Sequence, residues 1–212
     1  MDSLNGTLVL VIILFIIWVA TVIARRARTN TLQRLLATGQ FAEFYRLLGA
    51  TTTRLLYPGN TLASMNLDAL MLQGDDKQTE VLLDRMLRRR LGRRQRMDLV
   101  LKAFNFYVGT DEAKRSRELL AEIESWGQQY DPIKYECRQL YDVLVAGKSN
   151  HIDEMESQLD SVDTFQRGKL EYLLAVQHEH AGNHAKRDEY LSRAKRDGGL
   201  EKTPDAADTP NA

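Results

Sequence analysis

The chain has 212 residues, of which 43% are hydrophobic, 13 are glycine and 4 are proline. This composition fits an ordinary folded chain and excludes a disordered, collagen-like or disulfide-stapled protein; the single cysteine, Cys137, suits a reducing compartment. The 29 basic and 29 acidic side chains cancel but are unevenly placed, with 15 basic against 7 acidic in residues 25–102 and 14 against 21 in residues 103–212. This asymmetry indicates an anionic neighbour for the basic half.

The first part of the chain predicts a transmembrane helix. Residues 3–24 carry no charge, and as a helix rising ~1.5 Å per residue they would cross a hydrocarbon core ~30 Å thick. A cleaved signal peptide begins with basic residues, which Met1-Asp2-Ser3 lacks, and a buried core helix does not need so long an apolar run. We therefore expect residues 1–28 to form a membrane anchor with its basic flank.

Basic residues follow this segment and none precedes it. Arg25, Arg26 and Arg28 come directly after it, and flanks rich in Lys and Arg stay in the cytosol. The sequence therefore predicts a single-pass membrane protein with its N-terminus outside and its C-terminal domain in the cytosol.

Glycines recur at nearly constant spacing in the remainder of the chain. Successive spacings are 35, 35, 38 and 35 residues, and the positions are Gly39, Gly74, Gly109, Gly147 and Gly182. Each follows an apolar segment, where glycine can end a helix in the left-handed conformation. Polar residues just after them can cap the next helix, as Asp75 with Gln78 and Asn150 with Asp153.

The segments between these glycines have the apolar spacing of amphipathic helices. Ile133, Cys137, Leu140 and Leu144 share one helix face, and residues 97–108 are apolar almost all round. No strand pattern accompanies them. We therefore predict an all-α protein whose anchor is followed by an α-solenoid of about five antiparallel helix pairs, spanning residues 29–197.

This layout resembles the tetratricopeptide repeat family, whose unit is a helix pair of about 34 residues. The resemblance covers residues 31–196 and is strongest at Gly74-Asp75 and in the last unit, where Leu174-Ala175 precedes Gly182 and Leu191 and Ala194 follow it. The small residue expected before the turn glycine occurs only there, and the closing proline is missing. The resemblance implies a groove that holds a peptide or helix of another protein, and bacterial membrane-anchored relatives that assist envelope biogenesis or assemble membrane complexes.

Residues 198–212 contain one large apolar side chain, Leu200. Such a segment cannot bury enough surface to offset its chain entropy, so we expect a disordered tail.

An arginine cluster is the main candidate binding site. Seven of the twelve residues from Arg85 to Arg96 are arginine, and those predicted to make the contact are Arg88, Arg89, Arg90, Arg93, Arg94 and Arg96. Three anionic contacts are open: lipid headgroups, RNA phosphates, and an acidic protein, including the acidic half of a second copy. A solvated junction between repeats is the remaining interpretation. RNA is the least favoured, because its stacking candidates Phe104, Phe106 and Tyr107 lie in the most apolar helix.

Other reactive residue types lack the arrangement that chemistry needs. His178 and His180 point to different sides of a helix, and Gly182 separates them from His184, so we expect a surface cluster and no metal site. Cys137 lies on an apolar stripe and is expected to be a buried hydrophobe. No phosphate loop, zinc spacing or nucleophile elbow occurs, so no cofactor and no enzyme activity is expected.

Two classes of function remain. The favoured one is a membrane-anchored cytosolic scaffold or adaptor whose repeat groove binds a protein partner, in membrane complex assembly or envelope biogenesis. The alternative is a membrane-surface module that binds anionic lipid or RNA through its arginine cluster. The sequence leaves the partner and the oligomeric state open.

Overall fold

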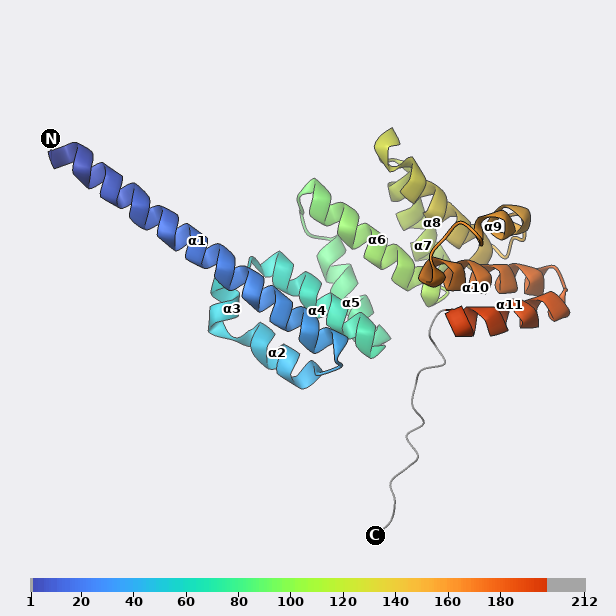
Figure 1. Ribbon diagram of the computed structural model, residues 1–212. Helices are drawn as coiled ribbons and strands as arrows, with labels where there is room; N and C mark the ends of the chain where they lie inside the picture. Colours follow the sequence, from blue (N-terminus) through green and yellow to red (C-terminus); the bar gives the residue numbers. More distant parts are fainter. Residues whose placement is uncertain (1, 198–212) are drawn as a thin grey trace, which may run out of the picture. The chain divides into compact units, whose positions relative to one another are not determined.

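A computed structural model describes the backbone of residues 2–197 and, within that range, every side chain except those of residues 2–13 and 17. Every regular element in this range is a helix, which confirms the prediction of an all-α protein (Figure 1). The chain divides into two compact units, one ending at Gly92 and the other beginning at Arg93. This boundary lies inside the predicted repeat domain 29–197, and the predicted tail 198–212 lies outside the described residues.

The first unit is built from α1 (Asp2–Ala37), α2 (Phe41–Gly49), α3 (Thr51–Leu56), α4 (Gly59–Gln73) and α5 (Asp76–Leu87). α1 packs on α2 and α3, α2 packs on α4, and α4 packs on α5. The core of this unit joins Leu32 of α1, Phe44 and Leu48 of α2, and Ala69 of α4. Burial of these apolar side chains, at roughly 25 cal/mol per Å², holds the three helices together.

The prediction of a membrane anchor is corrected here. Over the side chains that the structure describes, no helix has both the length and the apolar character needed to cross a membrane. The side chains of residues 2–13 and 17, which belong to the uncharged stretch 3–24, lie outside the described part. The predicted single-pass localisation is therefore wrong on this finding.

The arginines predicted to flank a membrane lie within α1, which continues without a break to Ala37. Arg28 donates a hydrogen bond from Nη2 to Thr52 Oγ1 of α3 at 3.2 Å. The Tyr57 hydroxyl donates to the backbone oxygen of Arg25 at 2.7 Å, while Arg25 and Arg26 side chains are exposed. This part of α1 is thus anchored to the rest of the first unit, and Leu32 one turn later enters its core.

The second unit is built from α6 (Arg93–Gly109), α7 (Ala113–Glu124), the 3₁₀ turn η1 (Gln128–Tyr130), α8 (Asp131–Leu144), α9 (Ile152–Gln158), α10 (Thr164–His180) and α11 (His184–Asp197). α6 packs on α7, α7 on α8, both α8 and α9 on α10, and α10 most extensively on α11. One core cluster gathers Val143, Met155, Leu173, Leu174 and Tyr190 from four of these helices. The predicted apolar face of α8 is buried at Cys137, and α7 buries Leu119, Leu120 and Ile123.

Four of the five periodic glycines have positive φ, between +65° and +72°: Gly39, Gly74, Gly147 and Gly182. At Gly74 the two bonds that close the helix end are present, from Gly74 N to Met71 O at 3.2 Å and from Asp75 N to Leu70 O at 3.1 Å. The Asp75 carboxylate then accepts from Gln78 N at 3.0 Å, which confirms the predicted cap of α5. The chain reverses here within two residues.

Gly109 does not make the predicted left-handed cap. It is the last residue of α6, and the positive φ of +59° falls two residues later on Asp111. Glu112 N bonds to Tyr107 O at 2.9 Å across this turn. Asp is one of the few residues besides glycine that enter the left-handed region, so the turn forms with glycine displaced from it. The predicted Asn150 cap is also wrong, because α9 starts at Ile152 with His151 as its cap residue.

We predict that Gly74→Ala lowers the free energy of unfolding by about 1 kcal/mol, because its φ of +67° strains any side chain. Gly109→Ala is the matched control: a Cβ at either position meets nothing within 4 Å, but Gly109 is helical. The control should leave stability unchanged or raise it slightly. Thermal melts followed by circular dichroism compare the two. Equal melting temperatures for both variants would contradict the turn assignment.

Candidate functional site

The arginine cluster is divided by the boundary between the two units. Arg85 lies in the last turn of α5, and Arg88, Arg89 and Arg90 follow in the first unit, whereas Arg93, Arg94 and Arg96 open α6 in the second. All of them except Arg96 are exposed. Arg85, Arg88, Arg89 and Arg90 therefore belong to the surface of the first unit, and Arg93, Arg94 and Arg96 belong to the second.

Arg96 is paired inside the second unit. Its Nε and Nη2 donate to the two carboxylate oxygens of Glu122 on α7 at 2.8 and 2.7 Å, and the two side chains are 33% and 31% exposed. The hydrogen bond to Glu122 raises the pKa of Arg96. Such a bidentate ion pair fixes α6 against α7. Arg96 thus differs from its exposed neighbours in the cluster by having a carboxylate partner. That partner lies 26 residues away in the sequence, so the spacing of residues could not predict the pair.

The arginines of the first unit border a pocket of about 530 Å³ between α2, α3, α4 and α5. Arg54 of α3, Arg85 of α5 and Arg89 just beyond α5 line it together. Of the arginines predicted to make the contact, only Arg89 lines this pocket; Arg85 was placed in the cluster but not among the contacts. Arg54 was missed, because α3 is short and lies more than thirty residues earlier. Folding therefore brings a third cation to two members of the cluster.

The rest of this pocket is apolar or uncharged. Its other lining residues include Leu48, Leu62, Met86, Asn66 and Tyr45. The Tyr45 hydroxyl donates to Gln73 Oε1 at 3.0 Å, and burial, followed by the charge of Asp75, raises the pKa of Tyr45. No Asp or Glu is among the described residues that line the pocket. A cationic rim thus surrounds an apolar floor.

The cations of this pocket are not neutralised within the described part of the chain. Arg89 Nη1 donates to the Asn60 amide oxygen at 3.3 Å, a neutral partner. For Arg54 and Arg85, the residues whose side chains the structure describes provide no ion pair and no hydrogen bond to the side chain. Three guanidinium groups, each with a planar set of N–H donors, are therefore available to a carboxylate or another anion.

Several cations in the second unit are paired instead. Arg138 bonds Glu124 at 2.6 Å, Lys148 bonds Asp142 at 2.9 Å, and Lys169 bonds Glu136 beside a pocket of about 280 Å³ between α8 and α10. In each pair the basic and the acidic side chain neutralise each other. The contrast makes the arginine pocket of the first unit the candidate binding site.

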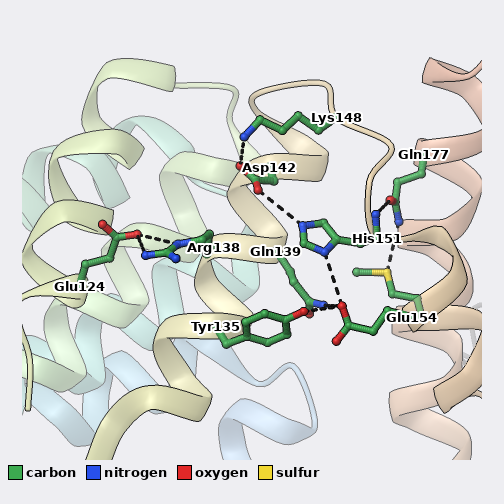
Figure 2. A network of polar contacts seen from close by, with 10 residues as sticks. Glu124, Tyr135, Arg138, Gln139, Asp142, Lys148, His151, Glu154 and Gln177 are labelled. Carbon is green, nitrogen blue, oxygen red and sulfur yellow. Dashed lines mark hydrogen bonds and ion pairs between the residues drawn. The ribbon is translucent and has the colours of Figure 1, made fainter. Parts of the chain in front are cut away.

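Figure 2 shows the polar network that joins α8, α9 and α10. The His151 ring lies between two carboxylates, with Nε2 3.5 Å from Asp142 and Nδ1 3.7 Å from Glu154. The backbone N–H of His151 donates to Gln177 Oε1 at 2.9 Å, and the Gln177 amide contacts Met155 Sδ at 3.3 Å. Since Gln177 is fully buried, this network fixes the segment before α9 onto α10.

The predicted histidine cluster does not form one surface patch. His178 is buried and stacks on Tyr190 with ring centroids 5.5 Å apart, while His180 and His184 are exposed. His184 Nδ1 lies 3.2 Å from Glu179. In the part of the chain that the structure describes, no three His, Cys, Asp or Glu side chains are placed to hold a metal ion.

The aromatic residues considered for RNA stacking are largely inaccessible. Phe104 and Tyr107 are buried in α6, and only Phe106 is half-buried. Base stacking needs an exposed aromatic face, so these residues serve packing.

Comparison with family models, with curated proteins and with solved structures finds no match to this chain.

We predict that Arg96→Gln destabilises the protein by up to about 1 kcal/mol, the range for a well-formed pair near the surface. Arg94→Gln is the control, because Arg94 is exposed in the same helical turn and has no partner among residues 2–197. Urea unfolding at low and high salt measures both. The account of Arg96 as an internal pair fails if the two variants unfold at the same urea concentration.

The reactivity of the Cys137 thiol measures how well the apolar face of α8 is buried. Burial, with a smaller contribution from the Glu136 charge, raises the pKa of its thiol to about 11. The thiolate is the reactive form, so alkylation by iodoacetamide at pH 8 should be slow in the folded protein and fast in denaturant. The folded rate should rise as the pH approaches 11. Rapid labelling of the folded protein at pH 8, followed by mass spectrometry, would contradict this burial.

Proposed function

We propose that this chain is a helical-repeat adaptor that binds an acidic protein partner through the arginine-lined pocket of its first unit. The tetratricopeptide-like solenoid is part of this proposal. Its support is the turn period of about 35 residues, with left-handed glycines at four of the turns, and the packing of helix pairs such as α4 with α5, α6 with α7 and α10 with α11 within each unit. Such helix stacks present grooves that bind segments of other proteins.

One observation carries the proposal: Arg54, Arg85 and Arg89 surround an apolar floor that no carboxylate lines among the described residues. Exposed arginines add little to stability, and like charges repel. Folding alone therefore gives no reason to gather them. A partner that supplies carboxylates and apolar side chains would neutralise the rim and cover the half-buried Leu62 and Leu82.

The apolar floor favours a protein over the other anions considered. RNA phosphates would satisfy the arginines but leave the floor uncovered, and Phe104 and Tyr107 are not available for stacking. Lipid headgroups would likewise engage only the rim. A folded partner or peptide combines both kinds of contact in one segment.

The test uses the full chain in its native cells, with the double variant Arg54→Gln/Arg85→Gln compared with the wild type. Chemical crosslinking and quantitative mass spectrometry should show a partner whose recovery falls about tenfold in the variant, the effect of losing ~1.4 kcal/mol of binding. Binding of the purified partner should weaken as salt rises, because screening reduces each charge contact.

Arg88→Gln/Arg94→Gln is the matched control, since both arginines are exposed and neither lines the pocket. This control should recover the partner as the wild type does, with unchanged circular dichroism for both double variants. Equal loss in both, or no loss in either, contradicts the pocket as the binding site. Binding of RNA or anionic vesicles that depends on Arg54 and Arg85, without any protein partner, also contradicts it.

A further inference from the structure

The arginine pocket continues into a second pocket along the same pair of helices. This neighbour, of about 260 Å³, shares Asn66, Leu82 and Arg85 with it and extends to Lys77 and Val81. Because the two pockets share these three lining residues, we treat them as one groove, which we call the α4–α5 groove. It runs from Lys77 near the start of α5 to Arg89 just beyond its end.

The walls of the α4–α5 groove follow helical spacing. On α4 the lining residues Leu62, Asn66 and Leu70 recur every four positions, and on α5 Gln78, Leu82 and Arg85 recur every three or four. Each set is one stripe of a helix, so the groove runs along both helix axes. At ~1.5 Å per residue, the length of α5 gives a groove of about 18 Å.

Apolar and cationic groups alternate along this groove. Leu70, Val81, Leu82 and Met86 are apolar; Val81 is 55% exposed and Leu82 half-buried, whereas Leu70 and Met86 are buried beneath them. Lys77, Arg85, Arg89 and Arg54 supply positive charge over its length, and no carboxylate is among the described residues that line either pocket. An occupant that fits must have an apolar stripe bordered by acidic side chains.

The backbone of the groove decides the conformation of that occupant. α4 and α5 use their backbone N–H and C=O groups within their own helices, so the groove walls offer no edge to pair with an extended chain. An extended peptide would leave its own backbone groups against apolar side chains without partners, which is costly. A helix satisfies its backbone internally and can pack its ridge of side chains between two helices.

We propose that the α4–α5 groove binds an acidic amphipathic helix of about three turns, with aliphatic residues at i, i+4 and i+7 facing Leu62, Val81 and Leu82 and carboxylates facing Arg85, Arg89 and Lys77. This inference rests on the proposed function and specifies the secondary structure and chemistry of the partner segment.

The probe is a fluorescent peptide of about 14 residues, with Leu at i, i+4 and i+7 and Glu beside that stripe. Three control peptides are measured beside it: a permuted peptide of equal composition without the apolar stripe, a peptide with two central prolines, and a peptide with Lys in place of Glu. Fluorescence anisotropy with the full chain at low salt measures the affinities. The acidic amphipathic peptide should bind at least about tenfold more tightly than each of the others.

Val81→Asp and Arg85→Gln should each weaken this peptide by about tenfold. Leu72→Asp is the matched control for Val81→Asp, because Leu72 is an aliphatic residue of α4, 63% exposed, that lines neither pocket. It should bind the peptide as the wild type does. Because these three side chains are exposed, circular dichroism should show all three variants folded.

Several results would overturn this inference. They are equal binding of the proline-containing or lysine-containing peptide, equal effects of Val81→Asp and Leu72→Asp, and no binding of the acidic helix. The crosslinking experiment above is independent of these peptides. A native partner lost in Arg54→Gln/Arg85→Gln, together with failure of the helical peptide, would keep the proposed function and remove only the helical ligand.

Discussion

The turn at Gly74 is the constraint on which the candidate site depends. A residue with a φ of +67° ends α4, and the Asp75 carboxylate caps the first turn of α5 directly afterwards. This short reversal brings the Leu62–Leu70 stripe of α4 beside the Leu82–Met86 stripe of α5. Without it the two apolar stripes would not border one groove, and Arg85 and Arg89 would not lie near Arg54.

Charge is treated differently in the two units. In the second unit, basic side chains form ion pairs with residues distant in sequence, such as Arg96 with Glu122 and Arg138 with Glu124. Asp142 and Glu154 lie beside His151. In the first unit, the pocket arginines have at most the neutral Asn60 as a partner among residues 2–197. A bound segment that supplies carboxylates would form the ion pairs that these guanidinium groups do not form within the folded unit. The excess of basic residues in the first part of the sequence therefore points to a binding surface.

Local signals in the sequence were sufficient for much of the fold. The glycine period and the apolar stripes predicted the helices, and the Asp75–Gln78 cap formed as expected because it depends only on residues close in sequence. The Gly109 cap failed because Asp111 can adopt the same conformation two residues later. The charge-free segment before Arg25 was interpreted as a membrane span, yet α1 continues beyond it and inserts Leu32 into the core. The sequence predicted only part of the site. Arg54 lies beside the same pocket as Arg85 because of how α3 packs, and no periodicity in the sequence indicates that packing.

We infer that the α4–α5 groove is the surface that receives an acidic partner segment. Methyl and arginine side-chain NMR of the full chain, titrated with the acidic amphipathic peptide, tests it most directly. The account predicts shifts concentrated on the methyl groups of Val81, Leu82 and Met86 and on the guanidinium groups of Arg85 and Arg89. Shifts confined to residues outside this groove, such as Val143 or Leu173 in the core of the second unit, would contradict it.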